Sequence, residues 1–137
     1  MKMSGLLSRR STDLPGVTGT VRHLHAGSEV PRRLGAKDVA VLDLNRTSPA
    51  TARALVGAGV AAVVHVPRAG EEMLPRTAFR VLAASTIPVI EDADLAGVAE
   101  GTRVRIDDGV VYGTKGGDEL AAGRVAGAST QIGRAHV

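Results

Sequence analysis

The strongest constraint on the fold of this chain is the close succession of a short apolar run, a capped helical segment and a second apolar run. The first run, residues 39–42, reads Val-Ala-Val-Leu, and the second, residues 60–66, reads Val-Ala-Ala-Val-Val-His-Val. Between them, Ser48 can cap a helix whose first position holds Pro49, where the missing N–H costs nothing. Bounded apolar runs of this length are typical of strands buried on both faces. The pattern predicts two parallel strands joined by a right-handed crossover.

The same unit repeats in the next part of the chain. Pro75 can open a second helix, and Ala78, Phe79 and Leu82 then fall on one face of it. Residues 87–90, Ile-Pro-Val-Ile, follow as a third apolar run of strand length. We therefore predict a parallel βαβαβ centre.

Strands of a different kind flank this centre. Residues 16–24 are rich in Val and Thr and alternate in polarity, which predicts a strand at the edge of a sheet. Residues 102–106 and 110–112 also alternate and are joined by Asp-Asp-Gly, the strongest hairpin signal in the chain. Residues 119–125 fit a strand or a helix, and we favour a strand. The predicted fold class is α/β, a three-layer β/β/α-like domain with a parallel βαβαβ centre and an added antiparallel hairpin.

The length of 137 residues fits one domain, which we place at residues 16–128. Residues 1–15 are polar and basic without a sustained period, so we expect a flexible basic leader there. We expect residues 129–137 to be a truncated end. Within it, residues 132–137 resemble the translation of a common sequencing-adapter read, which indicates an artefact. The natural protein is then expected to continue beyond Gln131.

The scarcity of aromatic side chains limits what this chain can bind. Phe79 is its one phenylalanine and Tyr112 its one tyrosine, and it has no tryptophan. Without a stacking platform, nucleic acid is not an expected partner, although the net charge is +3. The absence of cysteine excludes disulfides and thiolate chemistry and fits a cytoplasmic location.

The best site candidates follow the predicted parallel strands. Asp43 and Asn45 come after the first strand, His65 lies near the end of the next, and Arg68 follows it. The carboxyl ends of such strands meet at the edge where open α/β sheets bind ligands, and Arg68 would add an anion contact there. The competing interpretation gives His65 a structural role and makes Asp43 and Asn45 loop caps. We expect no catalytic residue, metal site or cofactor in this chain.

Two weaker constellations remain. His23 and His25 fall on one face of a predicted strand and could begin a metal site, but the sequence shows no third ligand, and we interpret them as exposed polar residues. The acidic group Glu91, Asp92 and Asp94 could take part in general acid/base chemistry, which requires carboxylates that face each other across a pocket. The pair 107–108 lies in a predicted hairpin turn, where aspartate is a favoured residue.

Five segments carry a resemblance to a known family. They are residues 13–19, 35–43, 50–66, 87–90 and 100–112, and together with their order and spacing they resemble the N-terminal region of SteA-like actinobacterial proteins. The resemblance covers nearly all of the chain that precedes residue 132.

The SteA-like resemblance implies a longer protein and a role. In that family this domain comes first, a thiamine pyrophosphokinase-like domain follows, and a hydrophobic part ends the chain. The family is associated with bacterial cell division and envelope assembly, as a component of the cytokinetic ring. We therefore expect a non-catalytic interaction or regulatory domain on the cytoplasmic side, membrane-associated through the C-terminal part of the parent protein. Its expected partners are the downstream domain, a membrane coiled-coil division protein and a second copy of the chain.

Two enzymatic alternatives stay open. In one, the chain is part of a thiamine pyrophosphokinase-like enzyme that transfers a pyrophosphoryl group from ATP and whose catalytic part lies outside this chain. In the other, it is a phosphocarrier, because the order of its strands resembles the swivelling phosphohistidine domain of phosphoenolpyruvate-using enzymes. Those domains hold a histidine just before their second helix, whereas residues 70–78 contain none.

Overall fold

The computed structural model describes residues 14–25, 30–66 and 76–126. The predicted leader lies almost wholly outside these residues, as do the predicted truncated end and Pro75. Throughout the described ranges, no helix combines the length and apolar character needed to cross a membrane.

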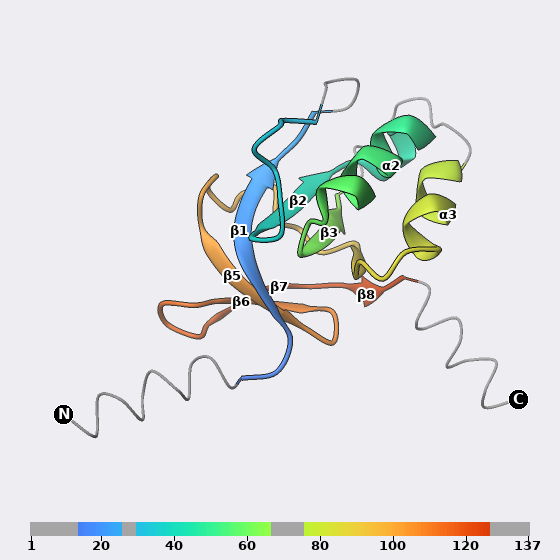
Figure 1. Cartoon of the computed structure of the whole chain (residues 1–137). Helices are drawn as coiled ribbons and strands as arrows, with labels where there is room; N and C mark the ends of the chain where they lie inside the picture. Colours follow the sequence, from blue (N-terminus) through green and yellow to red (C-terminus); the bar gives the residue numbers. More distant parts are fainter. Residues whose placement is uncertain (1–13, 26–29, 67–75, 127–137) are drawn as a thin grey trace, which may run out of the picture.

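The strands of the described residues form one sheet in the order β7-β6-β5-β1-β2-β3-β4-β8 (Figure 1). Two α-helices pack beside it, and a short 3-10 helix, η1, follows β2. In chain order the elements are β1 Val17–His23, β2 Asp38–Leu42, η1 Leu44–Arg46, α2 Pro49–Ala58, β3 Ala62–His65, α3 Thr77–Ala83, β4 Val89–Glu91, β5 Arg103–Asp107, β6 Val110–Gly113, β7 Glu119–Ala122 and β8 Arg124–Val125.

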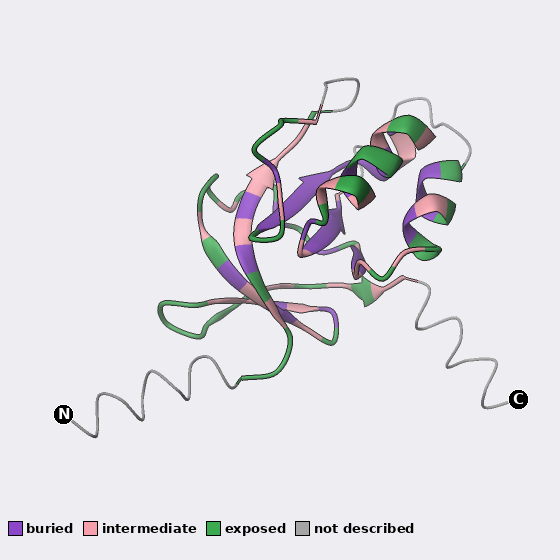
Figure 2. Ribbon diagram, in the orientation of Figure 1, coloured by how far each residue is buried: buried purple, intermediate pink, exposed green. Residues whose placement is uncertain are grey.

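The parallel centre of the sheet confirms the βαβαβ prediction. β1, β2, β3 and β4 lie side by side and parallel. Along the chain, α2 connects β2 to β3, and α3 lies between β3 and β4. All residues of β2 and β3 are buried (Figure 2), as expected for strands covered on both faces.

Helix α2 begins and ends where its sequence indicates. The Ser48 hydroxyl accepts the Thr51 N–H at 3.2 Å, and Pro49 holds the first position. Gly59 ends the helix in the left-handed conformation with φ of 69°, which glycine adopts without a steric penalty. Both ends of the helix therefore lie where these local signals predict.

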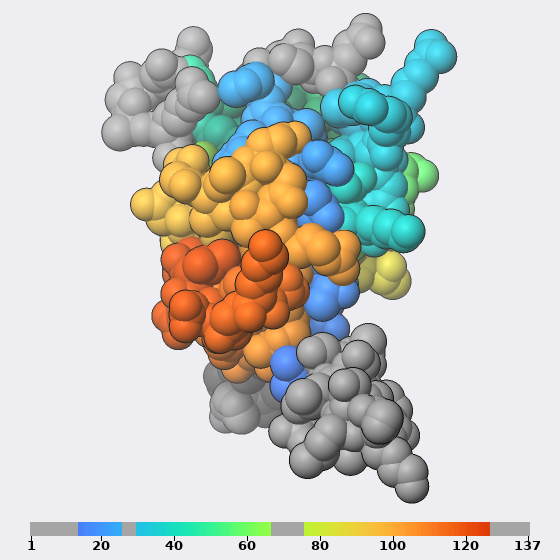
Figure 3. Space-filling model, turned by 90° about the vertical axis from the view of Figure 1, so that its left-hand side faces the viewer, coloured from blue at the N-terminus to red at the C-terminus, as the bar shows by residue number. Residues whose placement is uncertain are grey.

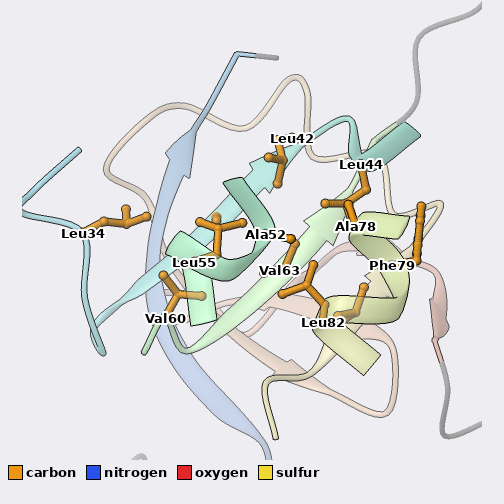
Figure 4. Close-up of a cluster of buried hydrophobic side chains, with 12 residues drawn as sticks. Leu34, Leu42, Leu44, Ala52, Leu55, Val60, Val63, Ala78, Phe79 and Leu82 are labelled. Atoms are coloured by element: carbon orange, nitrogen blue, oxygen red, sulfur yellow. The ribbon is translucent and has the colours of Figure 1, made fainter. Parts of the chain in front are cut away.

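One hydrophobic core lies between the helices and the parallel strands (Figure 4). Leu55 of α2 and Leu82 of α3 are fully buried there, over Val63 of β3. Ala78 and Phe79 complete the buried face of α3 that the sequence predicts. Small and aliphatic side chains therefore build this layer, with Phe79 as its aromatic member.

A second core lies on the opposite face of the parallel strands. There the β5–β6 hairpin turns Val104, Ile106 and Val111 against Val21 and Val64. Figure 3 looks onto the outside of this antiparallel layer, which covers the side of the molecule away from the helices. The sheet is thus bent into two layers under one layer of helices, which confirms the three-layer α/β fold class.

Two expectations about single strands need correction. β1 is not at the edge of the sheet, because β5 pairs with it antiparallel on the side away from β2. The strand predicted for residues 119–125 divides at Gly123 into β7 and β8, which lie at opposite ends of the strand order. A Cβ at Gly123 would lie 2.8 Å from the Ala93 nitrogen, so the backbone passes too close to β4 for a side chain.

Candidate functional site

Four parallel strands end side by side at one edge of the sheet. The register places His23 of β1 opposite Val41 of β2, Leu42 opposite His65 of β3, and His65 opposite Glu91 of β4. A cleft of about 760 Å³ opens at this edge. Ligands of open α/β sheets bind outside the carboxyl ends of the strands, so the cleft has the position of a binding site.

Asp43 lines the cleft directly after β2 and is 7% exposed. Its Oδ1 accepts the Asn45 N–H at 2.9 Å and so caps η1, while its backbone oxygen accepts the Thr47 hydroxyl at 2.8 Å. The Nε of Arg46 lies 3.8 Å from Oδ2. The Asp43 carboxylate therefore holds the turn after β2 and faces a guanidinium group.

His65 ends β3 and is 3% exposed. Its Nδ1 accepts the Leu44 N–H at 2.9 Å, and the ring meets Phe79 edge-on with the centroids 4.9 Å apart. Burial lowers the pKa of His65 below its ordinary value, although the nearby Asp43 carboxylate raises it. The neutral ring is the form that accepts the Leu44 hydrogen, so burial and hydrogen bonding favour the same protonation state.

The four site candidates of the sequence differ in where they lie relative to the cleft. Asp43 and His65 come together, with Asp43 Oδ1 lying 3.9 Å from His65 Nδ1. Asn45 contributes its backbone N–H to Asp43, in the loop-capping manner of the competing interpretation. His65 lies beneath the turn and is not among the described residues that line the cleft. Arg68 lies outside the described residues.

Arg46 and Asp92 also line the cleft, although neither is a site candidate in the sequence. Arg46 faces Asp43 because η1 brings positions three apart together, a spacing that the sequence does show. Asp92, a member of the acidic group after β4, has φ of 66°. Its N–H donates to the His65 carbonyl at 3.2 Å, and its carboxylate accepts a hydrogen bond from Arg124 Nη2 at 2.8 Å. No sequence pattern indicates this left-handed conformation, which aspartate tolerates better than most residues.

His23 and His25 both line the cleft. His25 is exposed as expected, whereas His23 is half-buried and its Nε2 donates to the Val98 carbonyl at 2.6 Å. In residues 14–25, 30–66 and 76–126, no group of three or more histidine or carboxylate side chains is arranged to hold a metal ion. The pair of histidines is therefore not completed into a metal centre by the described residues.

The hairpin aspartates lie where the sequence places them. Asp107 ends β5, and Asp108 adopts φ of 51° in the turn that Gly109 completes. Aspartate tolerates this conformation better than most residues, so the pair serves the turn.

Comparisons with known proteins show the fold and nothing finer. A scan of the sequence against protein-family models finds no match, and a search of curated proteins finds none. Among solved structures, the chain is similar to 3-isopropylmalate dehydratase (leuD) from Methanocaldococcus jannaschii, with a TM-score of 0.60 and 14% identity. The likeness covers 80% of this chain and 81% of the other. At this identity the two proteins share a fold, which supports the three-layer α/β class.

Proposed function

We propose that this chain is a non-catalytic interaction or regulatory domain of a SteA-like protein that acts in bacterial cell division and envelope assembly. The observation that carries the non-catalytic part is the hydrogen bond from the Leu44 N–H to His65 Nδ1, 2.9 Å long. A general base must present a free lone pair to its substrate, and this lone pair is already engaged by the backbone.

Two carboxylates at the carboxyl edge support the same conclusion. Asp43 accepts the Asn45 N–H and faces Arg46, and Asp92 accepts Arg124. Each of these carboxylates therefore stabilises a turn or an ion pair. A domain whose charged groups hold its own loops in place is suited to present a fixed surface to a partner.

The cell-division part of the proposal rests on the five segments that resemble SteA-like proteins. In that setting the partners are the thiamine pyrophosphokinase-like domain of the parent protein, a membrane coiled-coil division protein and a second copy of the chain. The location is the cytoplasmic face of the membrane, reached through the C-terminal part of the parent.

The cellular test is to fuse the full chain to a fluorescent protein and produce it in an actinobacterium. We expect fluorescence to gather at division septa, and excess chain to lengthen the cells by occupying its partner. The control is Leu82→Asp, which places a charge in the core and should remove the fold. Uniform fluorescence in cells of normal length would contradict the proposal.

The phosphocarrier alternative, and any pyrophosphokinase activity of this chain itself, are tested on the purified chain. Incubation with ATP, Mg²⁺ and thiamine should release no AMP, and incubation with a phosphoenolpyruvate-dependent phosphoryl donor should leave no acid-labile phosphate. AMP release that depends on thiamine would contradict the proposal that this chain is non-catalytic. Acid-labile phosphate would replace it with the phosphocarrier.

A further inference from the structure

The cleft at the ends of β1 to β4 combines an apolar floor with an acidic side. Val41, Leu42 and Val66 line it from β2 and the end of β3, and Asp92 and Asp94 line it from the segment after β4. Its volume of about 760 Å³ lies in the range of small-molecule sites. Such a cavity suits a ligand with a short apolar body and one polar end.

The charges of the cleft decide which polar end it favours. Asp43 faces Arg46, and Asp92 is held by Arg124 at 2.8 Å, so these two carboxylates are already balanced by guanidinium groups. Asp94 accepts only the Ala96 N–H, at 3.3 Å, and faces no cation among the described residues. With histidines counted as neutral, the cleft therefore carries a negative charge that no described side chain compensates.

From this arrangement we infer that the cleft binds a small organic cation, an ammonium group on a short apolar body. The ammonium lies against the Asp94 carboxylate, where it forms a charge-assisted hydrogen bond. The apolar body covers Val66 and Ala96, which line the cleft and are accessible at its surface. An anionic ligand is disfavoured because, among the described residues, the guanidinium that lines the cleft is that of Arg46, which already faces Asp43. The inference rests on the cleft alone and does not depend on the proposed role in division.

The test uses the full chain labelled with ¹⁵N and titrated with 2-phenylethylamine, which is an ammonium at neutral pH. We expect saturable shifts of the Leu24, Val66 and Ala96 amides, with a dissociation constant on the order of 1–10 mM for so small a probe. Two probes of similar shape serve as controls. Neutral 2-phenylethanol and anionic 3-phenylpropanoate should shift the same amides at least about 3-fold more weakly.

Two variants connect the binding to one carboxylate. Asp94→Asn should weaken the binding of 2-phenylethylamine by about 2- to 5-fold, since a partly exposed ion pair has an effect of this size. The binding of 2-phenylethanol should stay unchanged. Asp118→Asn, just before β7 at an exposed position, changes the net charge by the same amount as Asp94→Asn. It should leave the binding of both probes unchanged. Spectra of each variant show whether it is folded. Equal binding of the three probes, equal effects of the two variants, or the absence of saturable shifts would overturn the inference.

Discussion

The imidazole Nδ1 of His65 accepts the backbone N–H of Leu44 at 2.9 Å, and this bond joins the end of β3 to the turn that follows β2. Asp43, the residue before Leu44, lines the cleft, so the bond also fixes one wall of the candidate site. His65, a candidate for ligand contact in the sequence, thus has the structural role that the competing interpretation gives it, because its hydrogen bond fixes the turn after β2.

The first prediction concerns this hydrogen bond. His65→Leu keeps an apolar side chain in the core but leaves the Leu44 N–H without its acceptor, which should lower the free energy of unfolding by about 1–3 kcal/mol. His65→Asn retains an acceptor near the position of Nδ1. Amide hydrogen exchange should therefore show an unprotected Leu44 in the leucine variant and a protected one in the asparagine variant. Equal protection in both would contradict the assignment.

The second prediction concerns pH. Because burial lowers the pKa of His65, the unfolded chain binds more protons than the folded chain once the pH falls below the ordinary value of about 6.5. The stabilisation by neutral His65 is present above that pH and is lost as the pH falls toward the lowered pKa. Urea unfolding should therefore show the stability difference between the natural chain and His65→Leu shrinking from about pH 7.5 to about pH 5.5. A constant difference would show that His65 does not titrate in this way.

Sequence alone predicts the elements whose signals are local. Ser48, Pro49 and Gly59 mark helix α2 within the helix itself, and the Asp-Asp-Gly turn marks the hairpin. The position of β1 depends instead on its pairing with β5, in which Val17 lies opposite Ile106. Alternating polarity indicates a strand with one exposed face, and such a strand need not be at an edge. No local pattern separates the two cases.

The candidate site shows the same division. Asp43 and His65 could be placed together because parallel strands end at a common edge. The left-handed backbone of Asp92 and its contact with Arg124 could not, since they depend on β8 returning to pair with β4. The roles of the cleft residues are thus set by loop conformations that the spacing of residues does not encode.

The third prediction concerns the backbone of Asp92. Asp92→Asn and Asp92→Val both lose the ion pair with Arg124, but asparagine tolerates φ of 66° and a β-branched residue does not. The valine variant should be less stable than the asparagine variant by about 1–2 kcal/mol in urea unfolding. The same pair of substitutions at Asp94, which has no positive φ, serves as the control and should differ by less. Equal differences at the two positions would indicate that strain at Asp92 is not the cause.

The last prediction concerns Gly123, where the chain passes close to β4 just before β8 pairs with it. Its N–H donates to the Gly109 carbonyl at 2.8 Å, and a Cβ on Gly123 would contact the Glu91 carbonyl and lie 2.8 Å from the Ala93 nitrogen. Gly123→Ala should therefore push β8 away from β4 and destabilise the fold by about 1–3 kcal/mol.

Gly57 provides the matched control, because it is exposed within α2 and a Cβ there meets nothing within 4 Å. Gly57→Ala should stabilise the chain by about 0.5–1 kcal/mol through helix propensity. In urea unfolding, glycine-to-alanine substitution should therefore lower the free energy of unfolding at position 123 and raise it at position 57. Hydrogen exchange should also quicken at the Ala126 amide, which donates to Val89 at 2.7 Å, in the Gly123 variant only. An unchanged Ala126 amide would mean that β8 does not depend on the close approach at Gly123.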